Sequence, residues 1–144
     1  MAKKDTHPEI DLAGILRANG YRATSGRLAI LGVLVKEKKP LSSHEIFERC
    51  KTGSLDAVTV YRALEAFVAS RIVKRIDLQH GHVDYEFAFG DHHHHLVCKK
   101  CGSVEDFTVT GCTELAQRAC KSSTTFKTVE DHSMELFGVC VSCS

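Results

Sequence analysis

The sequence predicts an α+β fold in which a helical N-terminal part ends in a β-hairpin and a small α/β part follows. Three observations support this prediction. Apolar residues follow a helical period up to about residue 70 and then alternate in two short segments. Two C-x-x-C pairs, 98–101 and 140–143, bracket the last third of the chain. A run of four histidines, 92–95, precedes the first pair.

Four helices are predicted first, each with apolar residues at helical spacing and a polar residue that caps or breaks it. They are a short helix from Leu12 to Leu16 ended by Asn19-Gly20, a second from Thr24 or Ser25 to Val35, a third begun within 41–45, and a fourth over 57–70 capped by Asp56. A turn at Thr52-Gly53-Ser54 separates the third helix from the fourth.

Segments 72–78 and 83–87 alternate in polarity and flank His80-Gly81-His82, which predicts a hairpin. Helices followed by such a hairpin form a winged helix-turn-helix, in which helix 57–70 is the recognition helix and the hairpin is the wing. The remaining α/β part is predicted from strands near 96–97 and 104–107, a helix over 113–121, and strands at 128–129 and 134–139. The predicted domains are 1–88 and 89–144.

Composition excludes some classes of protein and favours another. No apolar run in the 144 residues approaches the roughly 20 that span a membrane, and the first residues lack a signal peptide, so we expect a cytoplasmic protein. Residues 1–80 carry 14 basic against 9 acidic side chains, whereas residues 81–144 carry 5 against 9. A basic part joined to an acidic part rich in histidine and cysteine is typical of a polyanion-binding module attached to a metal-binding one.

The paired cysteines Cys98, Cys101, Cys140 and Cys143 supply the four thiolates that a closed structural zinc site requires. A single C-x-x-C would leave a redox role open, but two pairs favour zinc. The 38 residues between the pairs must fold to bring them together. The remaining cysteines, Cys50, Cys112 and Cys120, have no such pairing, and a buried apolar role is expected for each.

The histidine run predicts a second metal. In an extended strand alternate side chains share a face, so His93 and His95 would serve one site and His92 and His94 another. On helix 57–70, Tyr61 can pack on a thymine methyl group and Arg62 can reach guanine or phosphate.

These features together resemble the ferric uptake regulator (Fur) family, in order along nearly the whole chain. The matching segments are Gly20-Tyr21-Arg22-Ala23-Thr24 with Arg27, Thr59-Val60-Tyr61-Arg62, the block from His92 to Gly102, His132-Ser133, and Gly138-Val139-Cys140. The resemblance implies a DNA-binding winged helix, a C-terminal dimerisation domain, and a metal-loaded homodimer that represses transcription from a palindromic operator in double-stranded DNA.

The resemblance also assigns residues. It implies DNA contacts by Arg22, Thr59, Tyr61 and Arg62, and structural zinc at the four paired cysteines. It implies a sensing site between the domains at Glu86, His93 and His95, with Asp77, His80, His82 and His44 as further candidates. It implies a second site within the dimerisation domain at His92, His94 and His132, with Glu105 or Glu114 as further candidates.

This chain departs from the family pattern at three positions. Lys39-Pro40-Leu41 stands where iron-sensing members commonly have a histidine, and His94 stands where many have aspartate, while the usual acid of the second site falls near Thr113. The four-histidine run resembles that of zinc-uptake regulators. The expected regulatory metal is therefore Zn²⁺ or Fe²⁺, with Mn²⁺ and Ni²⁺ as alternatives. A metal-dependent enzyme and a zinc storage or chaperone protein are the competing hypotheses, and we expect no enzyme.

Overall fold

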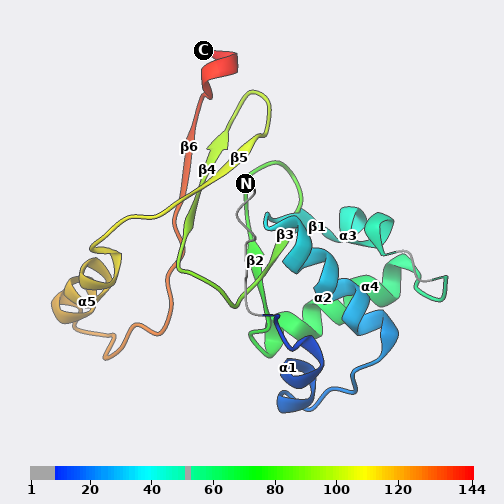
Figure 1. Cartoon of the computed structure of the whole chain (residues 1–144). Helices are drawn as coiled ribbons and strands as arrows, with labels where there is room; N and C mark the ends of the chain where they lie inside the picture. Colours follow the sequence, from blue (N-terminus) through cyan, green and yellow to red (C-terminus); the bar gives the residue numbers. More distant parts are fainter. Residues whose placement is uncertain (1–8, 51–52) are drawn as a thin grey trace, which may run out of the picture. The chain divides into compact units, whose positions relative to one another are not determined.

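The computed structural model describes residues 9–50 and 53–144 of the chain (Figure 1). These residues form two compact units, one that ends at Phe89 and one that begins at Gly90. We call them unit 1 and unit 2 and describe each by itself. Helices and antiparallel strands are both present in each unit, which confirms the predicted α+β class.

Unit 1 begins with the four predicted helices, whose ends differ from prediction by only a few residues. They are α1 (Leu12–Ala18), α2 (Ser25–Glu37), α3 (Ser43–Arg49) and α4 (Ala57–Ala69). Polar caps fix where all four start. Asp11 Oδ1 accepts from the backbone N–H of Gly14, Thr24 Oγ1 accepts from that of Arg27, and Asp56 Oδ1 accepts from that of Thr59. Ser42 and Glu45 form a capping box at α3. Thr52 of the predicted turn lies outside the described residues.

A three-stranded antiparallel sheet completes unit 1, with strand order β1-β3-β2. Its strands are β1 (Leu41–Ser42), β2 (Val73–Ile76) and β3 (Asp84–Phe87). The predicted hairpin is confirmed, although β2 is shorter than expected because Asp77 turns the chain by accepting from the backbone N–H of Gln79. Strand β1 was not predicted, since two residues are too few to show an alternating pattern.

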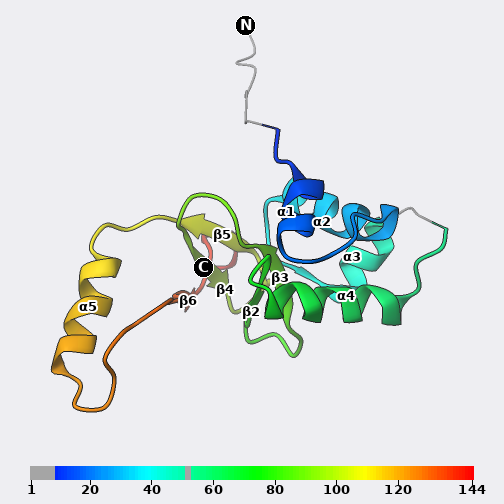
Figure 2. The same cartoon turned by 90° about the horizontal axis from the view of Figure 1, so that it is seen from below.

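The core of unit 1 explains the orientation of α4. Val60, Leu64 and Phe67 are fully buried and lie one turn or two apart on a single face of the helix. Figure 2 shows α4 along one side of the unit, with α1, α2 and α3 gathered on the other side of it. The Tyr21 hydroxyl donates to the Ala66 carbonyl oxygen at 2.9 Å, and the Tyr21 ring meets Phe67 edge-on. The opposite face of α4 therefore remains exposed.

Unit 2 is a second three-stranded sheet with one helix. Its elements are β4 (His94–Cys98), β5 (Val104–Phe107), α5 (Cys112–Ser122), β6 (Glu135–Gly138) and the 3₁₀ helix η1 (Val141–Cys143). Strand β4 is central, antiparallel to β5 and parallel to β6. Helix α5 stands beyond the end of the sheet at the tips of two extended connections (Figure 1).

One predicted element of unit 2 is wrong. Thr128 and Val129 were expected to form a strand, but they lie in the connection from α5 to β6 and pair with no strand in the described part of the chain. Val129 is exposed, so neither sheet pairing nor burial stabilises an extended strand there. Within 9–50 and 53–144, no helix has the length and apolar character needed to cross a membrane.

The packing of α4 generates a stability prediction. Leu64→Ala removes a fully buried side chain from the core of unit 1 and should lower the free energy of unfolding by about 2–5 kcal/mol. Val58→Ala, on the exposed face of the same helix, should change it by less than about 0.5 kcal/mol. All three tyrosines of the chain lie in unit 1, so tyrosine fluorescence in a urea titration reports this unit. Equal losses in the two variants would contradict the described core.

Candidate metal centres and nucleic-acid surface

The four paired cysteines converge at one end of the sheet of unit 2. Cys98 ends β4, and its register partner on the parallel strand β6, Gly138, comes two residues before Cys140. The four Sγ atoms all lie within 4.8 Å of one another, and those of Cys101 and Cys140 are 3.7 Å apart. A tetrahedral Zn²⁺ with Zn–S bonds of about 2.3 Å separates its sulfurs by about 3.8 Å. The arrangement therefore fits a structural zinc ion.

Electrostatics at this cluster favour a bound cation. The backbone N–H of Cys140 donates to Cys98 Sγ at 3.3 Å and lowers the pKa of Cys98 to about 6. The hydrogen bond between the thiols of Cys140 and Cys143 raises the pKa of Cys143 to about 12. Four thiols this close cannot all ionise without a compensating positive charge, and a divalent metal supplies it.

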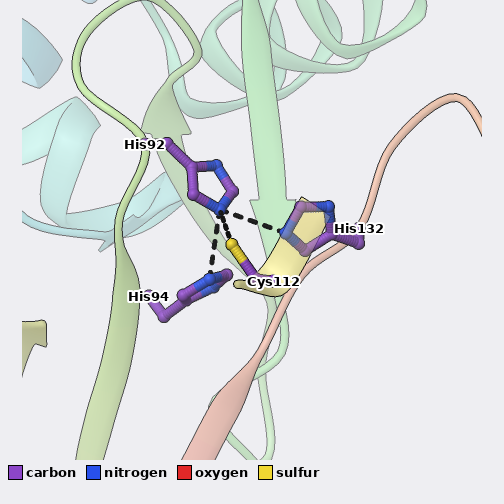
Figure 3. Close-up of side chains that lie close together, drawn as sticks. All are labelled: His92, His94, Cys112 and His132. Atoms are coloured by element: carbon purple, nitrogen blue, oxygen red, sulfur yellow. Dashed lines mark hydrogen bonds between the residues drawn. The ribbon is translucent and has the colours of Figure 1, made fainter. Parts of the chain in front are cut away.

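A second cluster lies at the other end of β4. His92 Nε2 is 3.1 Å from His94 Nε2, 3.1 Å from His132 Nε2 and 3.3 Å from Cys112 Sγ (Figure 3). Burial, followed by the neighbouring histidines, lowers the pKa of His94, which keeps its imidazole in the neutral form that binds metals. The structure thus brings together the three histidines expected at the second site.

Cys112 joins this cluster, contrary to the apolar role expected for it. Neither acid proposed for the second site takes this place. Glu105 is the register partner of Leu96, two residues along β4 from His94, and Glu114 lies about 200° around α5 from Cys112. The family resemblance places the acid of the second site near Thr113, and Cys112 is the neighbouring residue. That position was the one feature of the sequence that could have identified Cys112 as a member of this cluster.

His93 and His95 belong to the other face of the histidine run, opposite to His92 and His94. His93 Nδ1 is 2.9 Å from the carbonyl oxygen of Asp91, and a hydrogen bond donated there fixes the tautomer in which Nε2 carries the lone pair. His95 lies between two carboxylates of neighbouring strands: its Nε2 is 3.8 Å from Asp106 and its Nδ1 is 3.9 Å from Glu135. Both acids are register partners of His95, a relation that only the sheet pairing reveals.

The remaining candidates for the sensing site belong to unit 1. Glu86 lies on β3, and its place beside His93 and His95 stays a prediction. Asp77 forms the turn described above. His80 Nε2 and His82 Nε2 face the two oxygens of the buried Asp84 carboxylate, at 2.7 and 3.4 Å. Burial raises the pKa of Asp84, and the two imidazoles oppose that effect.

The exposed face of α4 carries three of the four residues expected to contact DNA: Thr59, Tyr61 and Arg62. Thr59 and Arg62 line one depression of unit 1 together with Arg22 and with Arg27, which the sequence had not placed at the site. Arg27 donates to the backbone carbonyl of Arg22 at 3.0 Å, and its guanidinium lies 5.3 Å from the centre of the Tyr21 ring.

Tyr61 lies on a neighbouring part of the same surface. Its side chain is exposed and lines a second depression with Arg75 and with His44, another candidate for the sensing site. The three arginines around Thr59 give this surface the basic character that phosphate contacts require, whereas Arg75 beside Tyr61 forms an ion pair with Glu65 at 3.6 Å.

Comparison with known proteins agrees with this geometry. Residues 18–137 match the profile of the ferric uptake regulator family. The ferric uptake regulation protein of Legionella pneumophila is 34% identical over 131 residues, 89% of this chain and 95% of that protein. The peroxide operon regulator of Bacillus subtilis is also 34% identical over 131 residues, 90% of this chain and 88% of its own length. The structure of the ferric uptake regulator from Francisella tularensis with iron superposes with a TM-score of 0.71 at 31% identity and covers 86% of this chain and 95% of that one.

The cysteine geometry predicts that Cys98→Ser or Cys140→Ser releases zinc and destabilises unit 2, because three thiolates close the tetrahedron poorly. Cys120→Ser is the matched control, since its thiol donates to the Phe126 carbonyl oxygen and does not belong to the four-cysteine cluster. Zinc content and thermal unfolding measure both effects. A Cys98→Ser protein with full zinc and the melting temperature of the parent would rule out the four-cysteine site.

Proposed function

Because the chain belongs to the ferric uptake regulator family of metal-responsive DNA-binding transcription regulators, we propose that it represses transcription as a metal-loaded homodimer. Domain 1–88 would bind a palindromic operator in double-stranded DNA, and domain 89–144 would dimerise and bind the metals. The proposed compartment is the cytoplasm. The observation that carries this function is the exposed arginine-lined face of α4 in a chain that also gathers histidines for metal.

The DNA contacts follow from which side of α4 is buried. Since Val60 and Leu64 face the core, Thr59, Tyr61 and Arg62 project from the helix toward solvent. In a winged helix this face enters the major groove, where Arg62 would read guanine or phosphate and Tyr61 a thymine methyl group. Arg22 and Arg27 would hold the neighbouring phosphate backbone.

Dimerisation through unit 2 is supported by its exposed apolar side chains. Leu96 and Leu136 are register partners on adjacent strands, and they are 41% and 45% exposed. Phe126 is 70% exposed. A unit of this size buries too little apolar surface to be stable alone. We expect a second copy of the chain to cover these exposed apolar side chains in a dimer.

The proposed sensing site uses Glu86, His93 and His95, with Asp106 as a further ligand from β5. A metal shared by the two domains would fix the angle between them, and therefore the spacing of the two recognition helices in a dimer. The nitrogen-rich ligands suit Zn²⁺ or Fe²⁺. The structure of the related Francisella protein contains iron, whereas the four-histidine run favours the zinc-uptake branch.

The competing hypotheses account for less of the chain. A metal-dependent enzyme needs an open metal position and a general base, and a zinc storage protein needs only the ligands. Both leave the wing, and the arginines that surround the exposed face of α4, without a role.

Arg62→Ala should weaken DNA binding while the protein remains a metal-loaded dimer, because the side chain lies outside the core. The expected loss is about 1–3 kcal/mol on a duplex that the metal-loaded parent has selected from a random pool, and less on unrelated DNA. Arg118→Ala, on α5 of unit 2, is the matched control. Operator affinity unchanged by Arg62→Ala would refute the placement of α4.

His93→Ala and His95→Ala should abolish metal-dependent DNA binding and leave the dimer and the four-cysteine zinc intact. His92→Ala should be milder, because its cluster lies within one unit and does not set the angle between domains. Affinity for the selected duplex, measured against free metal, compares the variants. The assignment of His93 and His95 to the sensing site would be wrong if His92→Ala lowered metal-dependent DNA affinity more than His93→Ala and His95→Ala do. It would also be wrong if His93→Ala responded to metal like the parent.

A further inference from the structure

The cluster of His92, His94, Cys112 and His132 contains a contact pattern that hydrogen bonding cannot satisfy. His92 Nε2 has three neighbours at 3.1–3.3 Å, the two imidazole nitrogens and the sulfur (Figure 3). An imidazole nitrogen carries one proton or one lone pair, directed in the plane of the ring. It can therefore make one good hydrogen bond, and two of the three contacts remain unexplained.

A single metal ion accounts for all of them. A tetrahedral ion about 2.0–2.1 Å from imidazole nitrogens and about 2.3 Å from a thiolate separates two nitrogens by about 3.3–3.4 Å and a nitrogen from the sulfur by about 3.6 Å. The observed separations from His92 Nε2 are within a few tenths of an ångström of these values. All four ligand atoms lie within 4.8 Å of one another.

We infer that the Cys112 thiolate is the fourth ligand of a closed three-histidine, one-cysteine site, and that it makes this site select zinc over iron(II) and manganese(II). The inference rests on the proposed metal-dependent function and specifies the metal of its second site. Manganese and iron(II) suit oxygen-containing ligand sets, whereas a soft thiolate with three imidazoles suits zinc. Four protein ligands also complete the tetrahedron, which characterises a retained ion rather than a freely exchanging one.

The location of Cys112 on α5 implies that metal binding at this site also affects the position of that helix. Cys112 is the first residue of α5, where the positive end of the helix dipole favours a negative ligand. It is also the only residue of α5 that is buried. The three histidines come from β4 and from the segments before β4 and β6. Zinc at this site would therefore fasten the start of α5 to the sheet of unit 2.

Cobalt(II) tests thiolate ligation, because a thiolate bound to Co²⁺ gives an intense near-ultraviolet charge-transfer band that nitrogen and oxygen ligands do not. The full chain is first loaded with one equivalent of zinc, which the four-cysteine site retains, and is then titrated with Co²⁺. The proposed sensing site has no cysteine, so a new band reports Cys112. Parent and Cys120→Ser should both show the band, and Cys112→Ser should lack it.

Metal selectivity is measured with a second variant, Cys112→Glu, which keeps a negative ligand but replaces sulfur with oxygen. Loss of a residue that only supports a metal ligand costs about 10–100-fold in metal affinity, and Cys112→Glu changes a ligand itself. The ratio of zinc affinity to Mn²⁺ affinity at this site should therefore fall at least about 10–100-fold below that of the parent. Hydrogen exchange of the α5 amides should slow when zinc binds in the parent and not in Cys112→Ser.

A cobalt band that survives in Cys112→Ser, or its absence from the parent, would overturn the inference. So would an unchanged preference for zinc over manganese in Cys112→Glu. These outcomes leave the proposed function standing, because the effect of His93→Ala on metal-dependent DNA binding is a separate measurement at the other face of the run.

Discussion

Unit 2 is too small to be held together by its apolar core alone. Its buried apolar positions are limited to Val97, Cys98 and Cys112, and two of these three are candidate metal ligands. A sheet of three short strands cannot offset the entropy of ordering about 50 residues by apolar burial alone. Metal coordination at the two ends of β4, and a partner over the exposed leucines, would supply what the core lacks. In the proposed regulator, metal would therefore contribute to the folding of this unit as well as act as its signal.

Unit 1, in contrast, is stabilised by its own apolar core. Its helices pack around a continuous apolar core, and the capping residues Thr24, Ser42 and Asp56 fix the helix starts without any metal. This independence allows α4 to present Thr59, Tyr61 and Arg62 on a rigid surface. In the proposed regulator, unit 1 would need metal only for the spacing of two such surfaces in a dimer, and this dependence would couple metal binding to DNA affinity.

The sequence predicted most of what depends on local pattern. Helix periodicity and caps identified α1 to α4, and the paired cysteines identified their own convergence. Three features were not predicted, because they depend on pairing between segments that are distant in the sequence. The two-residue strand β1 has no local signal, Asp106 and Glu135 become neighbours of His95 only through the sheet register, and Cys112 resembles a core cysteine until α5 is placed beside His92. The false strand at 128–129 shows the converse error, since a β-branched pair without a partner strand remains a connection.

The proposed function requires that metal control DNA binding by this chain. The most direct test is the affinity of the full chain for a duplex selected from a random pool, measured by gel shift across buffered concentrations of free Zn²⁺ and Fe²⁺. Affinity should fall to the level of unrelated DNA when the exchangeable metal is chelated and the four-cysteine zinc is retained, and it should return when metal is restored. Equal affinity for the selected duplex with and without exchangeable metal would contradict it.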